Sequence, residues 1–411
     1  MNILIANASH YQSGGDWTYI DNISKIYESH GHKIIHFAKK DERNFKSEFE
    51  NFFVEKIDYQ DVNSKKSPSN IIKVLSKSIY SKEAQTKLND LLDKYNVDVA
   101  QLNNINNAQT PSIIKTLSIR NIPIVWRILD YKLICANRTL LSKGSICYAC
   151  KNKGFHNIVI KKCIHDSYLA SLVGMMESTF YSISKYYEKV DLFSFQSEFT
   201  RDKFVEFGFD KSKTTIIENP IISECNPNFS NKNYILYFGR ISYEKGISDL
   251  LKAMLNLKNV NLVIVGDGPD MIKSKEFVLN NNLSNNISFA GPKWGTELDE
   301  YISNCKFVVL PSIWNDPNPL VVLQSYLFGK PVIGSDIGGI SDQIDHNKTG
   351  YLFPAGDTTS LAESIMKLYS DENLIVEMGK QAEIKAKTIH SPDRYYKKTM
   401  NIFNKLLSDK N

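Results

Sequence analysis

The chain has 411 residues, of which 42% are hydrophobic, 23% charged and 11% aromatic. This composition excludes a disordered chain, a collagen-like chain and a small disulfide scaffold, and the length predicts two or three domains. The net charge of +5 is too small to indicate a nucleic-acid-binding protein. No uncharged apolar run reaches the ~18–20 residues of a membrane-spanning helix. The start of the chain, residues 1–7, predicts a strand and not a signal peptide. We therefore expect a cytoplasmic globular protein.

Short apolar runs alternate with helical patterns through the first half of the chain. A helix is predicted at residues 82–95, where Leu88, Leu91 and Leu92 share one face. The strands predicted in this half are 3–6, 34–37, 97–102, 124–129, 192–195 and 215–217. Strands that alternate with helices predict a parallel sheet covered on both faces.

The same pattern begins again in the second half. The strands predicted there are 234–238, 262–265, 287–289, 307–310, 331–333 and 351–353. Two such series predict an α/β protein with two doubly wound domains, residues 1–220 and 221–390. The join at residues 218–233 is rich in Asn, Pro and Ser and lacks periodicity. The last segment, 391–411, is interpreted either as a surface helix or as a helix that crosses back to the first domain.

Ligands of open α/β sheets bind beyond the carboxyl ends of the strands. At one such end Gly239-Arg240 is followed by Lys245-Gly246, and these two cations suit phosphate oxygens. Two solvated surface cations are the alternative. The turns at Gly266–Pro269 and Gly338–Gly339 predict close backbone approach, although ordinary tight turns use the same residues.

The most informative block is residues 311–325. A buried strand runs into a loop that carries Asp316, and a helix opened by Pro319 follows. Gln324 lies on the same face of that helix as Leu320. The block predicts a polar site at the strand end.

In this order and spacing, these motifs resemble the retaining nucleotide-sugar glycosyltransferases of the GT-B group. The resemblance covers essentially the whole chain and is strongest over residues 234–354. It implies two Rossmann-like domains that face a central cleft. It also implies transfer from a nucleoside-diphosphate-sugar donor to a hydroxyl with retained configuration and no catalytic metal. A surface glycan, free or linked to a lipid carrier, is the acceptor that this family implies.

The resemblance also assigns donor-binding residues. Arg240 and Lys245 would hold the donor pyrophosphate, and preorganised cations can stabilise a departing nucleoside diphosphate without a metal. The amides of Leu320 and Val321 would lie near the helix N-terminus that receives phosphate. Gly266 would lie in a turn that the donor approaches.

Further roles follow on the sugar and acceptor sides. Two Glu residues of the family, one contacting the donor sugar and one the ribose, correspond here to Asp316 and Gln324. A Gly-rich turn at Gly15 would approach donor phosphate and acceptor. The family has a His where this chain has Leu129, so that contact is missing or replaced. Asp130 remains, either to receive an acceptor proton or as an ordinary turn residue.

Three departures from the family pattern, at Leu129, Asp316 and Gln324, support an alternative function. The chain would then be a non-catalytic nucleotide-sugar-binding subunit, a pseudo-glycosyltransferase. An assay of donor hydrolysis or transfer separates the two functions.

Four cysteines lie within 29 residues: Cys135, Cys147, Cys150 and Cys163. Their spacing predicts a tetrahedral, structural zinc site. A Cys-x-x-Cys redox pair and four independent thiols are the alternatives, and the redox pair lacks a thioredoxin-like βαβ context. Cys225 and Cys305 lie apart and are interpreted as buried thiols.

This cysteine segment belongs to an insertion of about residues 131–190. From 131 to 165 it contains seven Lys or Arg and no Asp or Glu. One interpretation is that these cations are solvated and offset the negative charge of a zinc–thiolate centre. The alternative is a basic surface that binds an anionic acceptor or lipid headgroups. The apolar stretch 168–195 is core or a landing face for a membrane. A peripheral location at the inner face of the membrane, and a membrane-docking scaffold as a third function, rest on these features.

Overall fold

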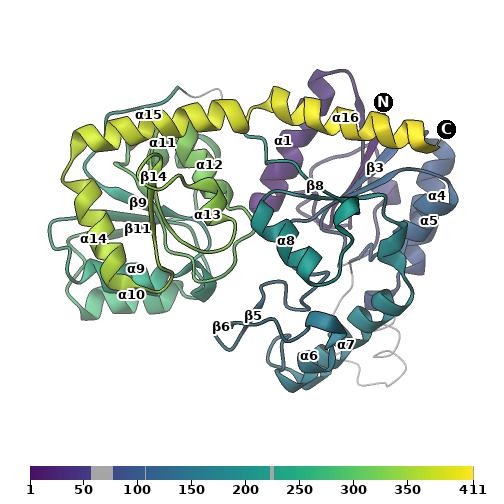
Figure 1. The fold of residues 1–411 in the computed structure, drawn as a ribbon, viewed down its shortest axis with the longest axis horizontal. Coiled ribbons are helices and arrows are strands. Elements are labelled where there is room, and N and C mark those ends of the chain that lie inside the picture. Colours follow the sequence, from purple (N-terminus) through teal and green to yellow (C-terminus); the bar gives the residue numbers. More distant parts are fainter. Residues whose placement is uncertain (57–76, 107, 223–225, 411) are drawn as a thin grey trace. The chain divides into compact units, whose positions relative to one another are not determined.

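The computed structural model describes residues 1–56, 77–106, 108–222 and 226–410. The chain divides into two compact units, each a parallel sheet with helices packed on it (Figure 1). Unit 1 comprises residues 1–196, 200–220 and 395–411, and unit 2 comprises 197–199 and 221–394. The α/β prediction is therefore confirmed, and it is realised twice.

The sheet of unit 1 has six strands in the order β2-β1-β3-β4-β7-β8, and every neighbouring pair is parallel. These strands are β1 Asn2–Ala6, β2 Lys33–Phe37, β3 Val99–Leu102, β4 Ile124–Arg127, β7 Leu192–Phe195 and β8 Thr214–Ile216. Each predicted strand of this half is present, with ends that differ by at most two residues.

The sheet of unit 2 has the order β11-β10-β9-β12-β13-β14 and is also parallel throughout. Its strands are β9 Ile235–Phe238, β10 Leu262–Val265, β11 Ile287–Gly291, β12 Val308–Leu310, β13 Val332–Ser335 and β14 Gly350–Phe353. In chain order this is the 3-2-1-4-5-6 arrangement of dinucleotide-binding sheets. The order reverses between β9 and β12, and such a switch point opens a crevice for a ligand.

Helices cover both faces of the sheets. Those of unit 1 are α1 Gly15–Ser29, α4 Lys82–Lys94, α5 Ile113–Ile119, α6 His156–Ile160, α7 Tyr168–Ile183 and α8 Glu198–Glu206, whose first two residues cluster with unit 2. Those of unit 2 are α9 Ile247–Met254, α10 Met271–Asn280, α11 Gly295–Asn304, α12 Leu320–Leu327, α13 Ile340–Gln343, α14 Thr358–Tyr369 and α15 Glu372–Ile389. A short hairpin, β5 Leu141–Ser142 and β6 Ser145–Ile146, and the last helix, α16 Pro392–Lys410, complete the fold.

Alternation along β9 divides the core of unit 2 into two layers. Ile235 and Tyr237 pack with buried residues of α9, α10 and α14, whereas Leu236 and Phe238 pack with those of α11, α12 and α13. Successive side chains of a strand point to opposite faces, so one buried strand supplies both layers. The strand therefore has to be apolar at every position, as the uninterrupted run 235–238 is.

Helix α16 returns to unit 1 over most of its length. Phe403 is fully buried in the core that α1 shares with β1, and the Tyr395 hydroxyl lies 2.7 Å from that of Tyr19. Near these tyrosines the buried Arg127 donates to Asn219 Oδ1 at 2.6 Å. The C-terminal helix and the end of the first unit are thus fixed by both apolar packing and hydrogen bonds.

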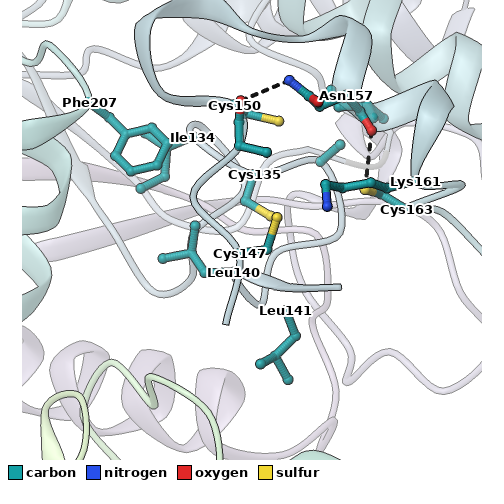
Figure 2. Close-up of a pocket in the computed structure, with 13 residues that line it drawn as sticks. Ile134, Cys135, Leu140, Leu141, Cys147, Cys150, Asn157, Lys161, Cys163 and Phe207 are labelled. Carbon is teal, nitrogen blue, oxygen red and sulfur yellow. Dashed lines mark hydrogen bonds between the residues drawn. The ribbon is translucent and has the colours of Figure 1, made fainter. Parts of the chain in front are cut away.

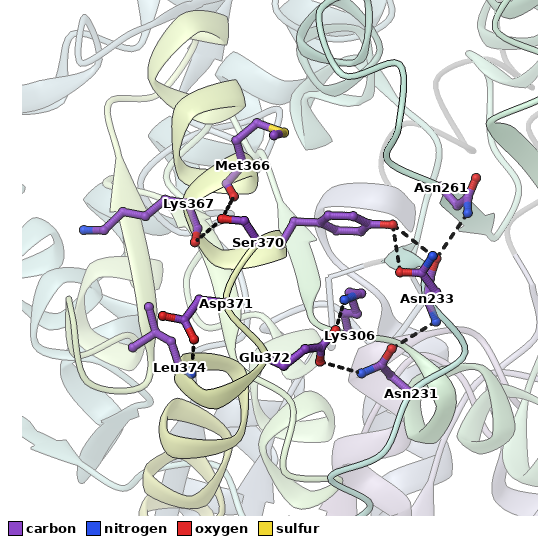
Figure 3. Close-up of polar contacts among 11 residues, drawn as sticks. Asn231, Asn233, Asn261, Lys306, Met366, Lys367, Ser370, Asp371, Glu372 and Leu374 are labelled. Carbon is purple, nitrogen blue, oxygen red and sulfur yellow. Dashed lines mark hydrogen bonds and ion pairs between the residues drawn. The ribbon is translucent and has the colours of Figure 1, made fainter.

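The polar join after Pro220 is anchored to unit 2 where the structure describes it. Asn231 donates to the Glu372 carboxylate at 3.1 Å, and the Tyr369 hydroxyl donates to Asn233 Oδ1 at 3.0 Å (Figure 3). Lys306 pairs with the same Glu372, and this contact holds the pKa of the carboxyl below its usual range. The Asn-rich composition therefore supplies side-chain hydrogen bonds to a segment without regular structure.

The remaining expectations about whole segments have mixed outcomes. Within the described ranges, no helix has the length and apolar character needed to cross a membrane. Cys305 is fully buried, as predicted, whereas Cys225 lies outside the described residues. The apolar stretch after residue 168 is only partly core, because one face of α7 is exposed.

Candidate functional site

Unit 2 collects most of the predicted site residues at the carboxyl edge of its sheet. Arg240 and Lys245 follow β9, Gly266 follows β10, and Asp316 follows β12. Strands β9 and β12 are the pair at which the strand order reverses. Parallel strands end at one edge, so residues far apart in the sequence are brought to the switch point.

Glycines let the turns at this edge pack backbone against backbone. A Cβ on Gly266 would lie 1.9 Å from the carbonyl oxygen of Gly239, and one on Gly246 would lie 1.8 Å from that of Pro311. No side chain can occupy such spaces without displacing the neighbouring turn. The close approach predicted at Gly266 therefore has a partner within the protein, the turn that carries Arg240.

The loop that carries Asp316 is held in the same way from its other side. A Cβ on Gly338 would lie 2.8 Å from the backbone of Asn315, and Gly338 has a φ of +62°. Gly339 donates its amide hydrogen to the Asp316 carbonyl at 2.7 Å. On the opposite side, the amide of Ile313 donates to the Glu244 carbonyl at 3.0 Å. The Asp316 loop is thus fixed between two neighbouring turns.

Lys245 and Asp316 form an ion pair, with 2.5 Å between Nζ and Oδ2. The side chain of Asp316 is 7% exposed and that of Lys245 is 23% exposed. The Lys245 ammonium also lies 5.2 Å from the centre of the Trp314 ring. Sequence reasoning assigned the two charged residues to different parts of the donor and missed their contact, because nothing local in the sequence shows it.

Arg240 differs from Lys245 in its surroundings. Its side chain is exposed, and among the described residues the guanidinium has no hydrogen-bond or ion-pair partner. Its backbone is fixed, because the buried Tyr237 hydroxyl donates to the Arg240 carbonyl at 2.7 Å. Burial, with Glu244 and Asp316 nearby, raises the pKa of Tyr237, so this hydroxyl keeps its proton and remains a donor. Arg240 therefore has a fixed backbone and a guanidinium that is open to an anionic ligand.

The start of α12 adds polar groups beside the Asp316 loop. The amides of Leu320 and Val321 lie in its first turn, and the described part of the chain provides no acceptor for them. One partly exposed face of the helix carries Leu320, Val321 and Gln324, and no partner for the Gln324 amide occurs among the described residues. Unpaired amides at a helix start favour an anion.

The two predicted residues of unit 1 also follow strand ends. Gly15 begins α1 after Gly14, whose φ is +124°. Asp130 follows β4 and accepts the Lys132 amide hydrogen at 2.8 Å, while Arg138 lies 3.5 Å from its other oxygen. Asp130 thus stabilises the turn after β4, as an ordinary turn residue does, and its carboxylate remains partly exposed. Leu129 packs against the core of α1.

The four cysteines of the insertion line one cavity (Figure 2). In the described ranges, however, no three His, Cys, Asp or Glu groups lie close enough together to hold a metal ion. The four side chains are therefore not arranged around a common centre in the described residues, and the zinc site stays a prediction. Burial raises the pKa of the Cys135 and Cys163 thiols, and that of Cys150 to about 12.

Residues 219–385 match the family model of the glycosyl transferases group 1. The chain is similar to N-acetyl-alpha-D-glucosaminyl L-malate synthase of Bacillus anthracis, with 28% identity over 44% of this chain and 56% of the relative. It is also similar to the amylovoran biosynthesis glycosyltransferase AmsK of Erwinia amylovora, with 25% identity over 42% of this chain and 44% of the relative. The chain thus matches about half the length of these curated relatives.

Solved structures resemble the whole chain. Anabaena HepE in complex with UDP has a TM-score of 0.66 at 16% identity and covers 98% of this chain and 100% of its own. Sucrose-phosphate synthase from Thermosynechococcus elongatus has a TM-score of 0.70 at 15% identity over 100% of both chains. These likenesses show that the two units have the GT-B fold, and the match to the glycosyl transferases group 1 covers residues 219–385.

Replacing Gly338 by Ala should destabilise unit 2 more than replacing Gly356 by Ala. Both glycines have positive φ, which costs a residue with a Cβ about 1–2 kcal/mol. Only Gly338 faces backbone within 3 Å, whereas a Cβ on Gly356 would have no other atom within 4 Å. The clash should lower the free energy of unfolding of the Gly338 variant by about 1–3 kcal/mol more. Urea denaturation followed by circular dichroism measures this difference. Equal losses for the two variants would show that the Asp316 loop is not tightly packed.

Proposed function

We propose that this chain is a hexosyl-type glycosyltransferase that uses a nucleoside-diphosphate sugar, retains the anomeric configuration and needs no catalytic metal. The observation that carries the proposal is the gathering of Arg240, Lys245 and Asp316 at the switch point of the unit 2 sheet. Solved complexes of HepE with UDP and with UDP-glucose, which share the fold, support this choice of donor.

Arg240 and the start of α12 would bind the donor phosphates. The guanidinium is exposed and can present two N–H groups to one phosphate. The amides of Leu320 and Val321 would donate hydrogen bonds to further phosphate oxygens. As the bond between sugar and diphosphate breaks, negative charge grows on the leaving oxygen, and fixed donors stabilise it.

Lys245 and Asp316 would act together on the donor. The ammonium can contact a diphosphate oxygen while it stays beside the carboxylate, which would accept hydrogen bonds from sugar hydroxyls. Gln324 would bind the ribose hydroxyls through its unpaired amide. In this proposal the acceptor oxygen forms a bond to the anomeric carbon as the diphosphate leaves, and the acceptor proton passes to the leaving group or to Asp130.

Unit 1 would supply the acceptor side. Gly15 and Asp130 follow β1 and β4, at the carboxyl edge of the unit 1 sheet. We infer a glycan acceptor, free or linked to a lipid, in the assembly of bacterial surface polysaccharide. Two relatives support this class: AmsK is named for amylovoran biosynthesis, and a TarM mutant was solved with fondaparinux, alpha-GlcNAc-glycerol and UDP.

Helix α7 favours a peripheral contact with the inner, anionic face of a membrane. One side of the helix exposes large apolar side chains at helical spacing. They are Leu169, Leu172, Met176, Phe180 and Ile183. Lys185 and Lys189 are exposed in the segment that directly follows the helix. An apolar stripe with flanking cations suits a bilayer that contains acidic lipids, and would bring the enzyme to a lipid-linked acceptor.

Arg240→Ala should weaken nucleoside-diphosphate binding without changing the unfolding midpoint, because the side chain is exposed. A charge-assisted hydrogen bond contributes about 1.5–3 kcal/mol, so its loss should lower the affinity roughly 10–150-fold. Calorimetry measures this affinity. Lys245→Ala should weaken binding too, and should also destabilise unit 2 because it leaves Asp316 buried and unpaired. Lys258→Ala, an exposed lysine elsewhere in unit 2, serves as the control. Wild-type affinity in the Arg240 variant would contradict the phosphate assignment.

Asp316→Asn should lower kcat more than it lowers nucleoside-diphosphate affinity, because it changes the group beside the sugar. Gln324→Ala should chiefly raise the dissociation constant, since it removes a ribose contact. Transfer and hydrolysis assays with a panel of nucleotide sugars provide the first measurement, and calorimetry the second. A wild-type protein that binds nucleotide but neither hydrolyses nor transfers any donor would favour the non-catalytic subunit instead.

The double substitution Leu172→Asp with Met176→Asp should abolish sedimentation with vesicles that contain phosphatidylglycerol. Wild-type protein should sediment with them at low salt and remain in solution with phosphatidylcholine alone. Leu279→Asp alters a similarly exposed leucine on α10 and should leave sedimentation unchanged. If wild type does not bind either vesicle, or if both variants lose binding equally, α7 is not the contact.

A further inference from the structure

The segment between β4 and α7 has little regular structure to hold it. It contains only the β5–β6 hairpin, one turn of 3-10 helix and the five-residue helix α6. Of the 14 non-glycine residues with positive φ in the described chain, eight lie here. These are Arg138, Leu140, Lys143, Asn152, Lys153, Lys162, His165 and Asp166. Such backbone persists only where other interactions determine it.

The four cysteines come to the same place from three parts of this segment. Cys135 follows β4, Cys147 and Cys150 follow the hairpin, and Cys163 follows α6. All four line one small cavity, together with apolar side chains that include Ile134, Leu140, Ile158 and Phe207 (Figure 2). None of the four is in a disulfide.

As thiols, these side chains make few strong interactions in the cavity. Cys135 Sγ lies 2.9 Å from Asn137 Oδ1, and the contact of Cys163 with the Asn157 carbonyl is 4.0 Å long. A weak donor in a small apolar cavity stabilises little. Four sulfurs on one cavity wall are, however, the ligand set of a structural zinc site. The seven Lys and Arg of residues 131–165 would offset the double negative charge of a zinc bound by four thiolates.

We propose that Cys135, Cys147, Cys150 and Cys163 bind one zinc ion, and that zinc binding draws their side chains from the cavity wall to a common centre. The four thiols would lose their protons on binding, and each sulfur would lie about 2.3 Å from the metal. Four protein ligands leave no position for water or substrate, so the metal is structural.

Backbone hydrogen bonds connect the proposed zinc site to Asp130, the residue proposed for the acceptor side. The Cys135 amide donates to the Tyr131 carbonyl at 2.7 Å, and the Arg138 amide donates to the Cys135 carbonyl at 2.9 Å. Arg138 is the cation 3.5 Å from Asp130. A metal at Cys135 would therefore fix the turn that holds Arg138 beside that carboxylate. This role is independent of whether the chain transfers sugar.

Metal analysis of protein purified without a His-tag tests the site directly. The proposal expects about one zinc per chain in wild type and in Cys305→Ala, whose cysteine lies in the core of unit 2. It expects a loss of at least tenfold in zinc content for Cys147→Ser with Cys150→Ser. Wild-type zinc below about a tenth of one equivalent, or equal zinc in the wild type and the double variant, would overturn it.

Chelation provides a second readout that does not depend on the variants folding. Removing zinc from the wild type should speed hydrogen exchange over residues 131–167 and leave nucleoside-diphosphate binding by unit 2 unchanged. Unchanged exchange in this segment after zinc has been removed would contradict a structural role. A disulfide between Cys147 and Cys150 in protein that carries no zinc would show that these thiols form a redox pair instead.

Discussion

The ion pair between Lys245 and Asp316 is the interaction on which the account of the site depends. A carboxylate as buried as Asp316 is tolerated only beside a cation, and Lys245 is that cation. The pair exists because two turns, after β9 and after β12, pack with almost no space between them at Gly246. The reversal of strand order between those two strands places both turns at one edge of the sheet.

The architecture could be predicted closely because most strands are short, largely apolar runs followed by a helix or a Gly-rich turn. The contacts within the site could not be predicted, since 71 positions separate Lys245 from Asp316. Only the strand order of the folded sheet brings them together. The glycines were identified correctly as points of close approach, but the sequence does not show that Gly266 faces Gly239 or that Gly338 faces Asn315.

The cysteine segment marks another limit of sequence reasoning. Spacing predicts that Cys147 and Cys150 are neighbours, and the fold adds Cys135 and Cys163 to the same cavity. Whether four thiols become a metal site depends on protonation and on a bound ion, which the spacing does not specify. In unit 1, Asp130 shows that a turn residue can also keep a partly exposed carboxylate, because one oxygen caps the Lys132 amide while the other faces Arg138.

A crystal structure of the chain with a bound nucleoside diphosphate would test the central claim most directly. The account predicts that the diphosphate lies within hydrogen-bond distance of Arg240 and Lys245, with its phosphates at the start of α12 and its ribose beside Gln324. A nucleotide bound elsewhere, with these residues untouched and the Lys245–Asp316 pair unchanged, would contradict it.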